Sequence, residues 1–406
     1  MSDKYASLGV SSSKEAVHRA TRNNSKGLFP YAFCKIDSYD YSPKWLNNIA
    51  KLFGHRQVGI SHADGAGTKT SLAYIYWKET GDMSVWRGVV QDSIAMNIDD
   101  VACVGGLTGR MFLTSSIDRN SHRIPDEVIA ELINGENIFL DMLRAYEIDI
   151  TGQSGETADV SDLVRTVTVN NSLFCQMPYK NVIDNANIKP GNFIVGLSSD
   201  GCALYESKYN GGMGSNGLTL GRHGVFAPEY RKKYPESFES LIDAGSNGVQ
   251  SYTGTKKLDE KVNAWGVSYG EMVLSPTRTY APVIKKYHDL HLDREISGMV
   301  HCSGGGQTKV LNYLSNPMTV TKYDMFDIPQ LFNIIQKESG QPWEHMYKTF
   351  NMGHRMEIYT PSKDAAEKMI DVSKSFGVEA KIIGCVERGA KRLLIKSPHG
   401  RFEYSR

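Results

Sequence analysis

One glycine-rich segment of this chain, Asp64-Gly65-Ala66-Gly67-Thr68-Lys69, combines residue types that could bind a phosphate group. Its two glycines allow the backbone to approach an anion closely, its threonine offers a hydroxyl, and Lys69 adds a positive charge. Asp64 follows an expected strand over Val58–Ser61, where its carboxylate could hold Mg²⁺. The spacing is not that of a Walker A loop. A tight turn with a solvated lysine explains the same residues, so both interpretations stay open.

Three aspartates lie in an apolar stretch, Gly88–Val104, that predicts a buried helix. Asp92 and Asp99 are two helical turns apart, so they share one face of that helix. A carboxylate among apolar side chains is unfavourable unless it is paired or bound to a metal ion. Asp92 fits a structural ion pair as well as a functional site. Asp100 lies nearer the helix end, which favours a metal ligand.

A fourth acid, Glu156, lies in Gly155-Glu156-Thr157, after an expected strand over Ile148–Thr151 and a glycine turn. In α/β proteins ligands bind beyond the carboxyl ends of strands, so a carboxylate here could face a ligand. An exposed loop acid is the ordinary alternative, since most glutamates are exposed.

Two further glycine-rich loops lie in the second half of the chain. The segment Gly212–Gly217 formally matches G-x-G-x-x-G, but the expected strand before it ends well upstream, at Ser199. A dinucleotide fingerprint opens directly from a strand, so we expect a loop that closes over a different ligand. The second loop, His301–Gly306, follows an expected ordered stretch over Ile296–Val300. Its Cys302 is expected to be a buried, inert thiol.

The elements that must position these loops are recognisable from their periodicity. Apolar residues at three- and four-residue steps predict a helix over 126–145 and another over Ser362–Gly377. Strands are expected over Val164–Phe174, which alternates as a half-exposed strand would, and over Ala380–Val386. A further helical stretch is expected near Lys14–Arg22.

Two domains are expected from a length of 406 residues. The segment Met177–Asn192 holds two prolines and a Pro-Gly turn, so we place the boundary there, with domains 1–180 and 181–406. The apolar stretch Phe193–Ser199 is then a buried strand that opens the second domain.

The composition excludes several classes of protein. The net charge of +1 gives no sign of a nucleic-acid or lipid-surface partner. The six cysteines include no C-x-x-C pair, which favours reduced thiols. No signal peptide and no apolar run of about 18 residues is evident. We therefore expect a soluble, cytoplasmic α/β protein without a membrane or nucleic-acid partner, whose glycine-rich loop and acids suit Mg²⁺ and a phosphate-bearing small molecule.

Eight segments, in order, resemble one family, phosphoribosylformylglycinamidine cyclo-ligase, also called aminoimidazole ribonucleotide synthetase. They are Asp64–Lys69 (D-G-A-G-T-K), Asp92–Asp100 (D-S-I-A-M-N-I-D-D), Gly155–Ala158 (G-E-T-A), Gly191–Ser199 (G-N-F-I-V-G-L-S-S), Ser215–Gly217 (S-N-G), Leu274–Tyr280 (L-S-P-T-R-T-Y), His301–Gly306 (H-C-S-G-G-G) and Thr349–Gly353 (T-F-N-M-G). Each is a weak signal alone, but the ordered set spans most of the chain.

The resemblance implies a two-domain α/β (α+β) fold, an N-terminal sheet domain that dimerises, and a C-terminal α/β domain. It implies a cyclo-ligase of purine biosynthesis, in which ATP phosphorylates the amide oxygen of formylglycinamidine ribonucleotide before the imidazole ring closes. The implied metal and catalytic residues are Asp64, Asp100 and Glu156, with Lys69 also catalytic. The implied phosphate contacts are Gly65, Gly67, Thr68, Lys69 and Lys26, and the implied substrate contacts are Ser215, Asn216, Gly304, Gly305 and Gly306.

Two departures from the family leave alternatives open. The family usually has a histidine just before the S-N-G triplet, where this chain has Gly214. In addition, Cys202–Met213 is an insertion and residues 225–268 are longer than usual. A different ATP-dependent enzyme of the same superfamily is one alternative. A nucleotide-binding homologue that has lost turnover is the other.

Overall fold

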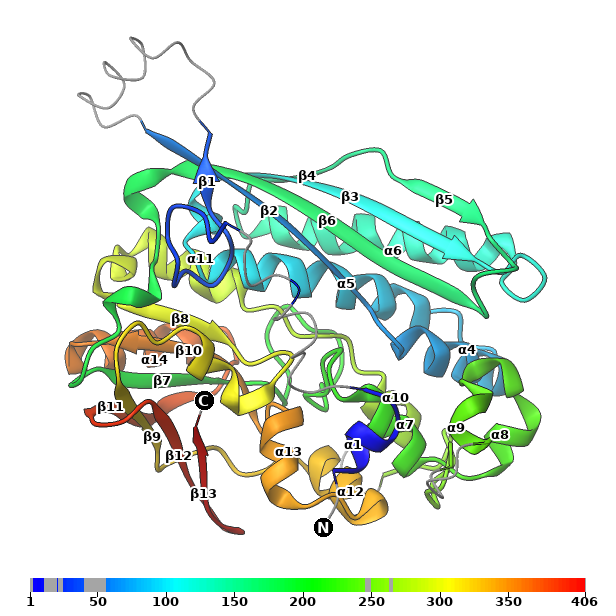
Figure 1. Cartoon of the computed structure of the whole chain (residues 1–406). Coiled ribbons are helices and arrows are strands. Elements are labelled where there is room, and N and C mark those ends of the chain that lie inside the picture. Colours follow the sequence, from blue (N-terminus) through cyan, green and yellow to red (C-terminus); the bar gives the residue numbers. More distant parts are fainter. Residues whose placement is uncertain are drawn as a thin grey trace.

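Two β-sheets with packed helices form the framework of the protein (Figure 1). The structure is a computed structural model that describes residues 3–10, 20, 25–39, 56–244, 250–262 and 266–405. The helix expected near Lys14–Arg22 therefore lies outside the described residues, except for Ala20 at its end.

The first sheet uses strands from the first half of the chain. They are β1 (Asp37–Ser38), β2 (Gln57–Gly65), β3 (Arg110–Arg119), β4 (Ile150–Gly152), β5 (Glu156–Asp159) and β6 (Val167–Pro178). The order is β1-β2-β6-β3-β4, and β5 also pairs with β3. Neighbours from β1 to β3 are antiparallel, whereas β4 and β5 run parallel to β3.

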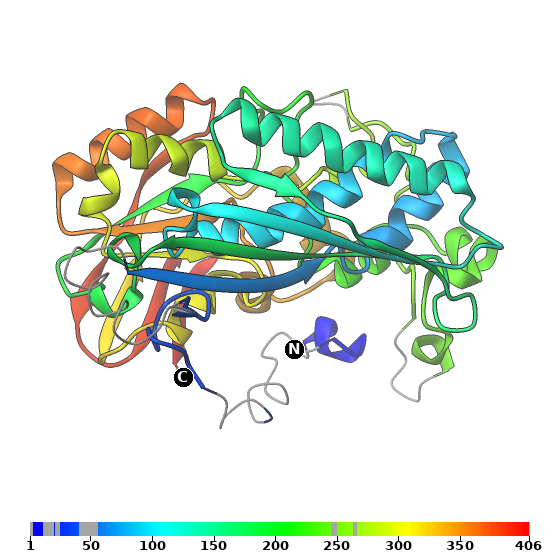
Figure 2. The same ribbon diagram turned by 90° about the horizontal axis from the view of Figure 1, so that it is seen from above.

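Helices cover one face of this sheet, and in the described part of the chain no helix lies on the other face (Figure 2). Helix α5 (Val85–Ala102) packs on β2 and β6, α6 (Asp126–Ala145) lies against α5, and α4 (Lys69–Thr80) also packs on α5. The predicted helix over 126–145 is confirmed to the residue. Strand β6 alternates between buried and less buried positions, as predicted, because its apolar residues face α5.

The second sheet uses strands from the second half. They are β7 (Phe193–Ser198), β8 (Gly298–His301), β9 (Met318–Lys322), β10 (His354–Thr360), β11 (Ala380–Arg388), β12 (Arg392–Ser397) and β13 (Gly400–Ser405). The order is β13-β12-β9-β11-β7-β10-β8, and all neighbours are antiparallel except β12 with β9. The predicted buried strand over Phe193–Ser199 is confirmed as β7, and the strand over Ala380–Val386 as part of β11.

The remaining α-helices come from the N-terminal segment and from the second half of the chain. They are α1 (Lys4–Ser7), α7 (Leu218–Val225), α8 (Glu229–Lys233), α9 (Ser240–Ala244), α10 (Tyr269–Val273), α11 (Ala281–Asp289), α12 (Gln330–Ser339), α13 (Trp343–Thr349) and α14 (Lys363–Ser375). Helix α14 confirms the predicted helix, since Ser362 caps it by accepting from Ala365 N, and Gly377 follows with φ +71°. Among the described residues, no helix is both long and apolar enough to cross a bilayer.

The segment Leu274–Tyr280 ties the two halves together by lying along α5. Asp92 Oδ1 accepts hydrogen bonds from the backbone N and the hydroxyl of Thr277, at 2.7 and 2.6 Å. Asp99 Oδ1 accepts from the Thr279 hydroxyl at 2.7 Å and from Tyr280 N at 3.0 Å. Asp92 and Asp99 are thus hydrogen-bonded to a loop from the second half of the chain. These bonds explain how two acidic side chains are accommodated in an apolar, buried helix.

Candidate active site

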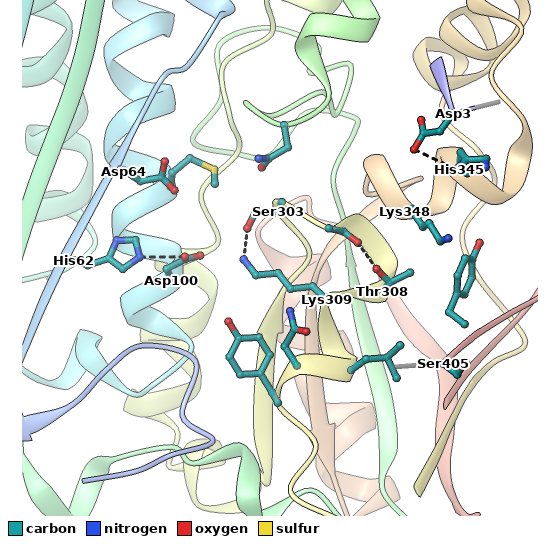
Figure 3. A pocket seen from close by; sticks show the side chains of 18 of the residues that line it. Asp3, His62, Asp64, Asp100, Ser303, Thr308, Lys309, His345, Lys348 and Ser405 are labelled. Carbon is teal, nitrogen blue, oxygen red and sulfur yellow. Dashed lines mark hydrogen bonds and ion pairs between the residues drawn. The ribbon is translucent and has the colours of Figure 1, made fainter. Parts of the chain in front are cut away.

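A cavity of about 810 Å³ lies between the end of α5, the carboxyl-terminal part of β2 and the loop after β8 (Figure 3). Its lining includes the polar side chains of His62, Asp64, Asp100, Asn216, Ser303, Thr308, Lys309, His345 and Lys348. Asp3 and Ser405 also line it, so segments near the two ends of the described chain meet at one cavity. Residues from both sheets and both chain halves therefore face one space.

Asp100 is held between two histidines at the buried end of the cavity. Its Oδ1 lies 2.6 Å from Nδ1 of His301, and its Oδ2 lies 3.2 Å from Nε2 of His62. Burial raises the pKa of Asp100, but the charge of Lys309 and the hydrogen bonds from the two histidines outweigh burial and hold that pKa well below its usual range. Asp100 is therefore a carboxylate with both oxygens engaged.

Arg355 fixes the protonation of His301. Its Nε–H can only donate, and it lies 3.1 Å from His301 Nε2, which must therefore be the bare nitrogen. The proton of the neutral ring is then on Nδ1 and is donated to Asp100. Burial lowers the pKa of His301 to about 4, in agreement with this neutral form. His301 is a fixed donor to Asp100 and has no free nitrogen with which to accept a proton from a substrate.

His62 differs from His301 in its hydrogen bonding, because both ring nitrogens of His62 face acceptors. The amide nitrogen of Asn97 donates to the carbonyl oxygens of Asp64, Ser93 and Asn171. The amide oxygen of Asn97 is thereby turned to His62 Nδ1, at 2.9 Å, while Nε2 of His62 faces Asp100. Burial lowers the pKa of His62, but the hydrogen bond and the charge of Asp100 outweigh it, so the pKa is raised. Both ring nitrogens of His62 are thus placed to donate at the cavity wall, an arrangement that favours the protonated ring.

Five predicted site residues line the cavity: Asp64, Asp100, Asn216, Gly304 and Gly305. Asp64 accepts a hydrogen bond from the following backbone N of Gly65, at 2.8 Å. Burial raises the pKa of Asp64, the Gly65 bond opposes that rise, and the nearby Asp100 charge adds to it. Strand β2 runs through Gly65, so Asp64 is presented by a strand and not by the glycine turn.

Lys69 does not reach this cavity. Its ammonium group is fully buried, donates to Asp92 Oδ1 at 2.7 Å, and donates to the carbonyl oxygen of Ser275. Glu156 is exposed on β5, and Lys26 is exposed in the segment before β1. None of the three lines the cavity, so the carboxylates of Asp64, Asp100 and Glu156 do not converge within one chain.

The other predicted contacts lie beside the cavity. Thr68 Oγ1 is 3.2 Å from Thr219 Oγ1 on α7, so the two chain halves meet at this loop. The buried Ser215 hydroxyl has no hydrogen-bond partner among the described residues. Gly306 is packed so closely on backbone atoms of α13 and Phe350 that a Cβ would lie 2.6 Å from an oxygen. Gly65, Gly67 and these residues keep their ligand roles as predictions.

Sequence reasoning missed His62, His301, Lys309 and Arg355. Strand periodicity carried a signal for His62, because it lies two positions before Asp64 and so points to the same face. Lys309 follows the His301–Gly306 loop within one turn. Nothing in the sequence indicates that Arg355, from β10, reaches His301.

A metal ion fits this cavity only in part. In the portion of the chain that the structure describes, one group of three possible ligands converges, Cys302, His354 and Glu357, with ligand atoms within 4.8 Å of one another. Lys322 donates to Glu357 there, so a cation already occupies that buried cluster.

In the cavity itself, Asp64 is the carboxylate without an ion pair among the described residues. One carboxylate suits Mg²⁺ when phosphate oxygens and water complete its shell.

The two-sheet α/β arrangement is an AIR synthase-like fold. The sequence matches the family described as AIR synthase related protein, C-terminal domain, over residues 189–395 of the 406. The chain therefore belongs to the AIR synthase related protein family.

Two curated relatives are named phosphoribosylformylglycinamidine cyclo-ligase. That of Alkaliphilus metalliredigens is 26% identical over 344 residues, which are 84% of this chain and 83% of the relative. That of Carboxydothermus hydrogenoformans is 24% identical over 395 residues, 97% of this chain and 98% of the relative. Among solved structures, PurL of T. maritima complexed with ADP is similar with a TM-score of 0.48 and 11% identity. That match covers 86% of this chain, which spans 43% of the PurL chain.

Proposed function

We propose that the protein is an ATP-dependent cyclo-ligase that converts formylglycinamidine ribonucleotide to aminoimidazole ribonucleotide, ADP and phosphate. Membership of the family and the names of the relatives that span most of the chain support this proposal. The observation that carries it is the shared cavity, where Asp64 and Asp100 from the first half face Asn216, Gly304 and Gly305 from the second.

The residues of the cavity supply positioning and charge compensation, the two things that phosphoryl transfer chiefly needs. When bound, ATP supplies the phosphoryl group that makes the substrate's amide oxygen a leaving group, which a nitrogen of the same substrate then displaces. Asn216 and the backbone at Gly304 and Gly305 orient the substrate's polar groups. The ring of His62, held by Asp100 and favoured in its protonated form, compensates negative charge at the cavity wall.

Three finer elements belong to the same proposal. Mg²⁺ is held by Asp64 together with phosphate oxygens and water, and the protein acts in the cytoplasm. It forms a homodimer through the N-terminal domain of residues 1–180. The dimer is supported by the face of the first sheet on which no described residue forms a helix, where Phe112 and Phe174 form a half-buried cross-strand pair that a second copy would cover.

The test mixes purified protein, Mg-ATP and formylglycinamidine ribonucleotide, and follows ADP and the aminoimidazole product. We expect both products in equal amounts, with none when the ribonucleotide is left out. ADP without aminoimidazole would favour another substrate in the same superfamily. Nucleotide binding without ADP formation would favour a homologue without turnover, and the absence of nucleotide binding would refute the enzymatic proposal.

A further inference from the structure

Lys309 is a cation on the cavity wall that forms no ion pair among the described residues, although its charge stabilises the anion of Asp100. It follows the glycine loop in the 3-10 helix η6 (Gly306–Asn312), and its ammonium group donates to the Ser303 hydroxyl (Figure 3). The same nitrogen lies 4.6 Å from the ring centroid of Phe33, which stacks on Tyr313 at 4.7 Å. These contacts hold the side chain in place by a cation–π interaction and one hydrogen bond.

Asp100, the acid whose pKa the charge of Lys309 lowers, already has other hydrogen-bond partners. Asp100 gives one oxygen to His301 and one to His62, and no ion pair joins Lys309 to a carboxylate among the described residues. An ammonium group has three N–H donors, and Ser303 accepts one of them. A positioned lysine with donors left over, beside a carboxylate that is fully engaged, is arranged to accept an anion from outside the protein.

Lys309 differs from Lys69 in both its position and its pairing. Lys69 is the lysine of the D-G-A-G-T-K segment, but it is fully buried and paired with Asp92. Lys309, in contrast, lines the cavity together with Ser303, Gly304 and Lys348. Lys348 lies on α13, with its nitrogen 5.5 Å from the ring centroid of Tyr404, and it adds a second cation to the same cavity.

We propose that Lys309, supported by Lys348, binds a phosphate group of the ligand inside this cavity. The proposal rests on the proposed function, since both ligands of the cyclo-ligase carry phosphate. The shared chemistry is a phosphate oxyanion, which comes either from the polyphosphate of ATP or from the phosphate ester of the ribonucleotide. Lys309 therefore takes the phosphate-contact role that the sequence assigned to Lys69.

The test compares the wild type with Lys309→Met, Lys309→Arg and a control, Lys363→Met. Lys363 is an exposed α14 residue whose ammonium group lies 3.3 Å from Glu367, so its loss should leave binding unchanged. Calorimetric titration with Mg-ATP alone, and separately with formylglycinamidine ribonucleotide alone, measures each affinity without turnover. We expect Lys309→Met to raise the Kd of one of the two by about tenfold or more, while Lys309→Arg stays within about threefold of wild type.

The ligand whose Kd rises identifies the source of the phosphate, and a rise for both assigns Lys309 to both. Equal affinities of Lys309→Met and wild type for both ligands would overturn this inference while leaving the cyclo-ligase proposal standing. If the wild type binds neither ligand, both proposals fail. Thermal unfolding of each variant confirms that any loss of affinity occurs in folded protein.

Discussion

The ammonium nitrogen of Lys69 lies 2.7 Å from Oδ1 of Asp92, and both side chains are fully buried between α4 and α5. Asp92 also accepts two hydrogen bonds from Thr277, so this ion pair connects the glycine-rich segment Asp64–Lys69 to the segment Leu274–Tyr280. Lys69, which the sequence predicted as a catalytic residue, therefore contributes to the contact between the two halves of the chain.

Lys69→Met should therefore act mainly on stability. Removal of one member of a buried pair leaves the other charge uncompensated, so we expect a loss of about 3–5 kcal/mol in the free energy of unfolding. The double variant Lys69→Met with Asp92→Leu should recover part of that loss. Urea unfolding measures both, with the exposed Lys363→Met as control. A double variant that is stable yet inactive would instead return Lys69 to a direct catalytic role.

Asp64→Asn and Asp100→Asn should separate function from folding. The carboxylate of Asp64 accepts a hydrogen bond only from Gly65 N among the described residues, so Asp64→Asn should leave the thermal midpoint nearly unaltered and lower kcat by about a hundredfold or more. Asp100 holds both His62 and His301, so its change should also destabilise the fold by about 3 kcal/mol. Full activity in Asp64→Asn would remove it from the site.

Gly214 and Arg355 should behave as a coupled pair. Gly214 has φ +66°, and a Cβ there would lie 3.0 Å from Nη1 of Arg355, which has no hydrogen-bond partner among the described residues. Gly214→Ala should cost about 1–2 kcal/mol for the backbone conformation, plus the steric contact. Gly81→Ala, at φ +73° in open space, measures the backbone part alone.

The Arg355→Met background should remove the steric part of the Gly214→Ala effect. Unfolding of the two single variants and the double variant then gives a coupling of about 0.5 kcal/mol or more. The neighbouring Asn216 lines the cavity, so Gly214→Ala should also raise the KM for the ribonucleotide. Strictly additive effects would show that the two residues are not in contact.

His223 should make the protein sensitive to acid. It is buried beside Tyr252, neither ring nitrogen has a partner among the described residues, and burial together with the charge of Arg222 lowers its pKa to about 2. The unfolded chain takes up a proton as the pH falls below 6.5, whereas the folded chain does not. Stability from this residue is thus complete above pH 6.5 and declines below it by up to about 1.4 kcal/mol per pH unit.

His223→Phe should flatten that pH dependence, because an aromatic ring without titratable nitrogens fills the same space. Thermal unfolding of the variant and wild type between pH 5 and 8 should show their difference growing in favour of the variant as the pH falls. His122→Phe, at an exposed position, is the control and should leave the curve unchanged. Parallel curves for His223→Phe and wild type would show that His223 is not buried as a neutral ring.

Apolar periodicity and capping residues were sufficient to predict the bounds of the strongly periodic helices and strands. Helix α6 and helix α14, with its Ser362 cap, lie where apolar spacing and capping placed them, and β7 begins and ends within one residue of its predicted bounds. These features depend on interactions within a few residues, which a sequence displays directly. The division into domains 1–180 and 181–406 remains a prediction.

The sequence by itself determined which glycine loops and acids this protein carries, the type of its main elements and the family it resembles. Only the tertiary structure decided which lysine faces the cavity. Lys69 and Lys309 each follow a glycine-rich loop, but Asp92 neutralises the first, whereas Lys309 is left among ring and hydroxyl contacts. The reason is that the partner of a charged side chain is set by contacts between segments distant in the chain, and these arise only when the two sheets pack together.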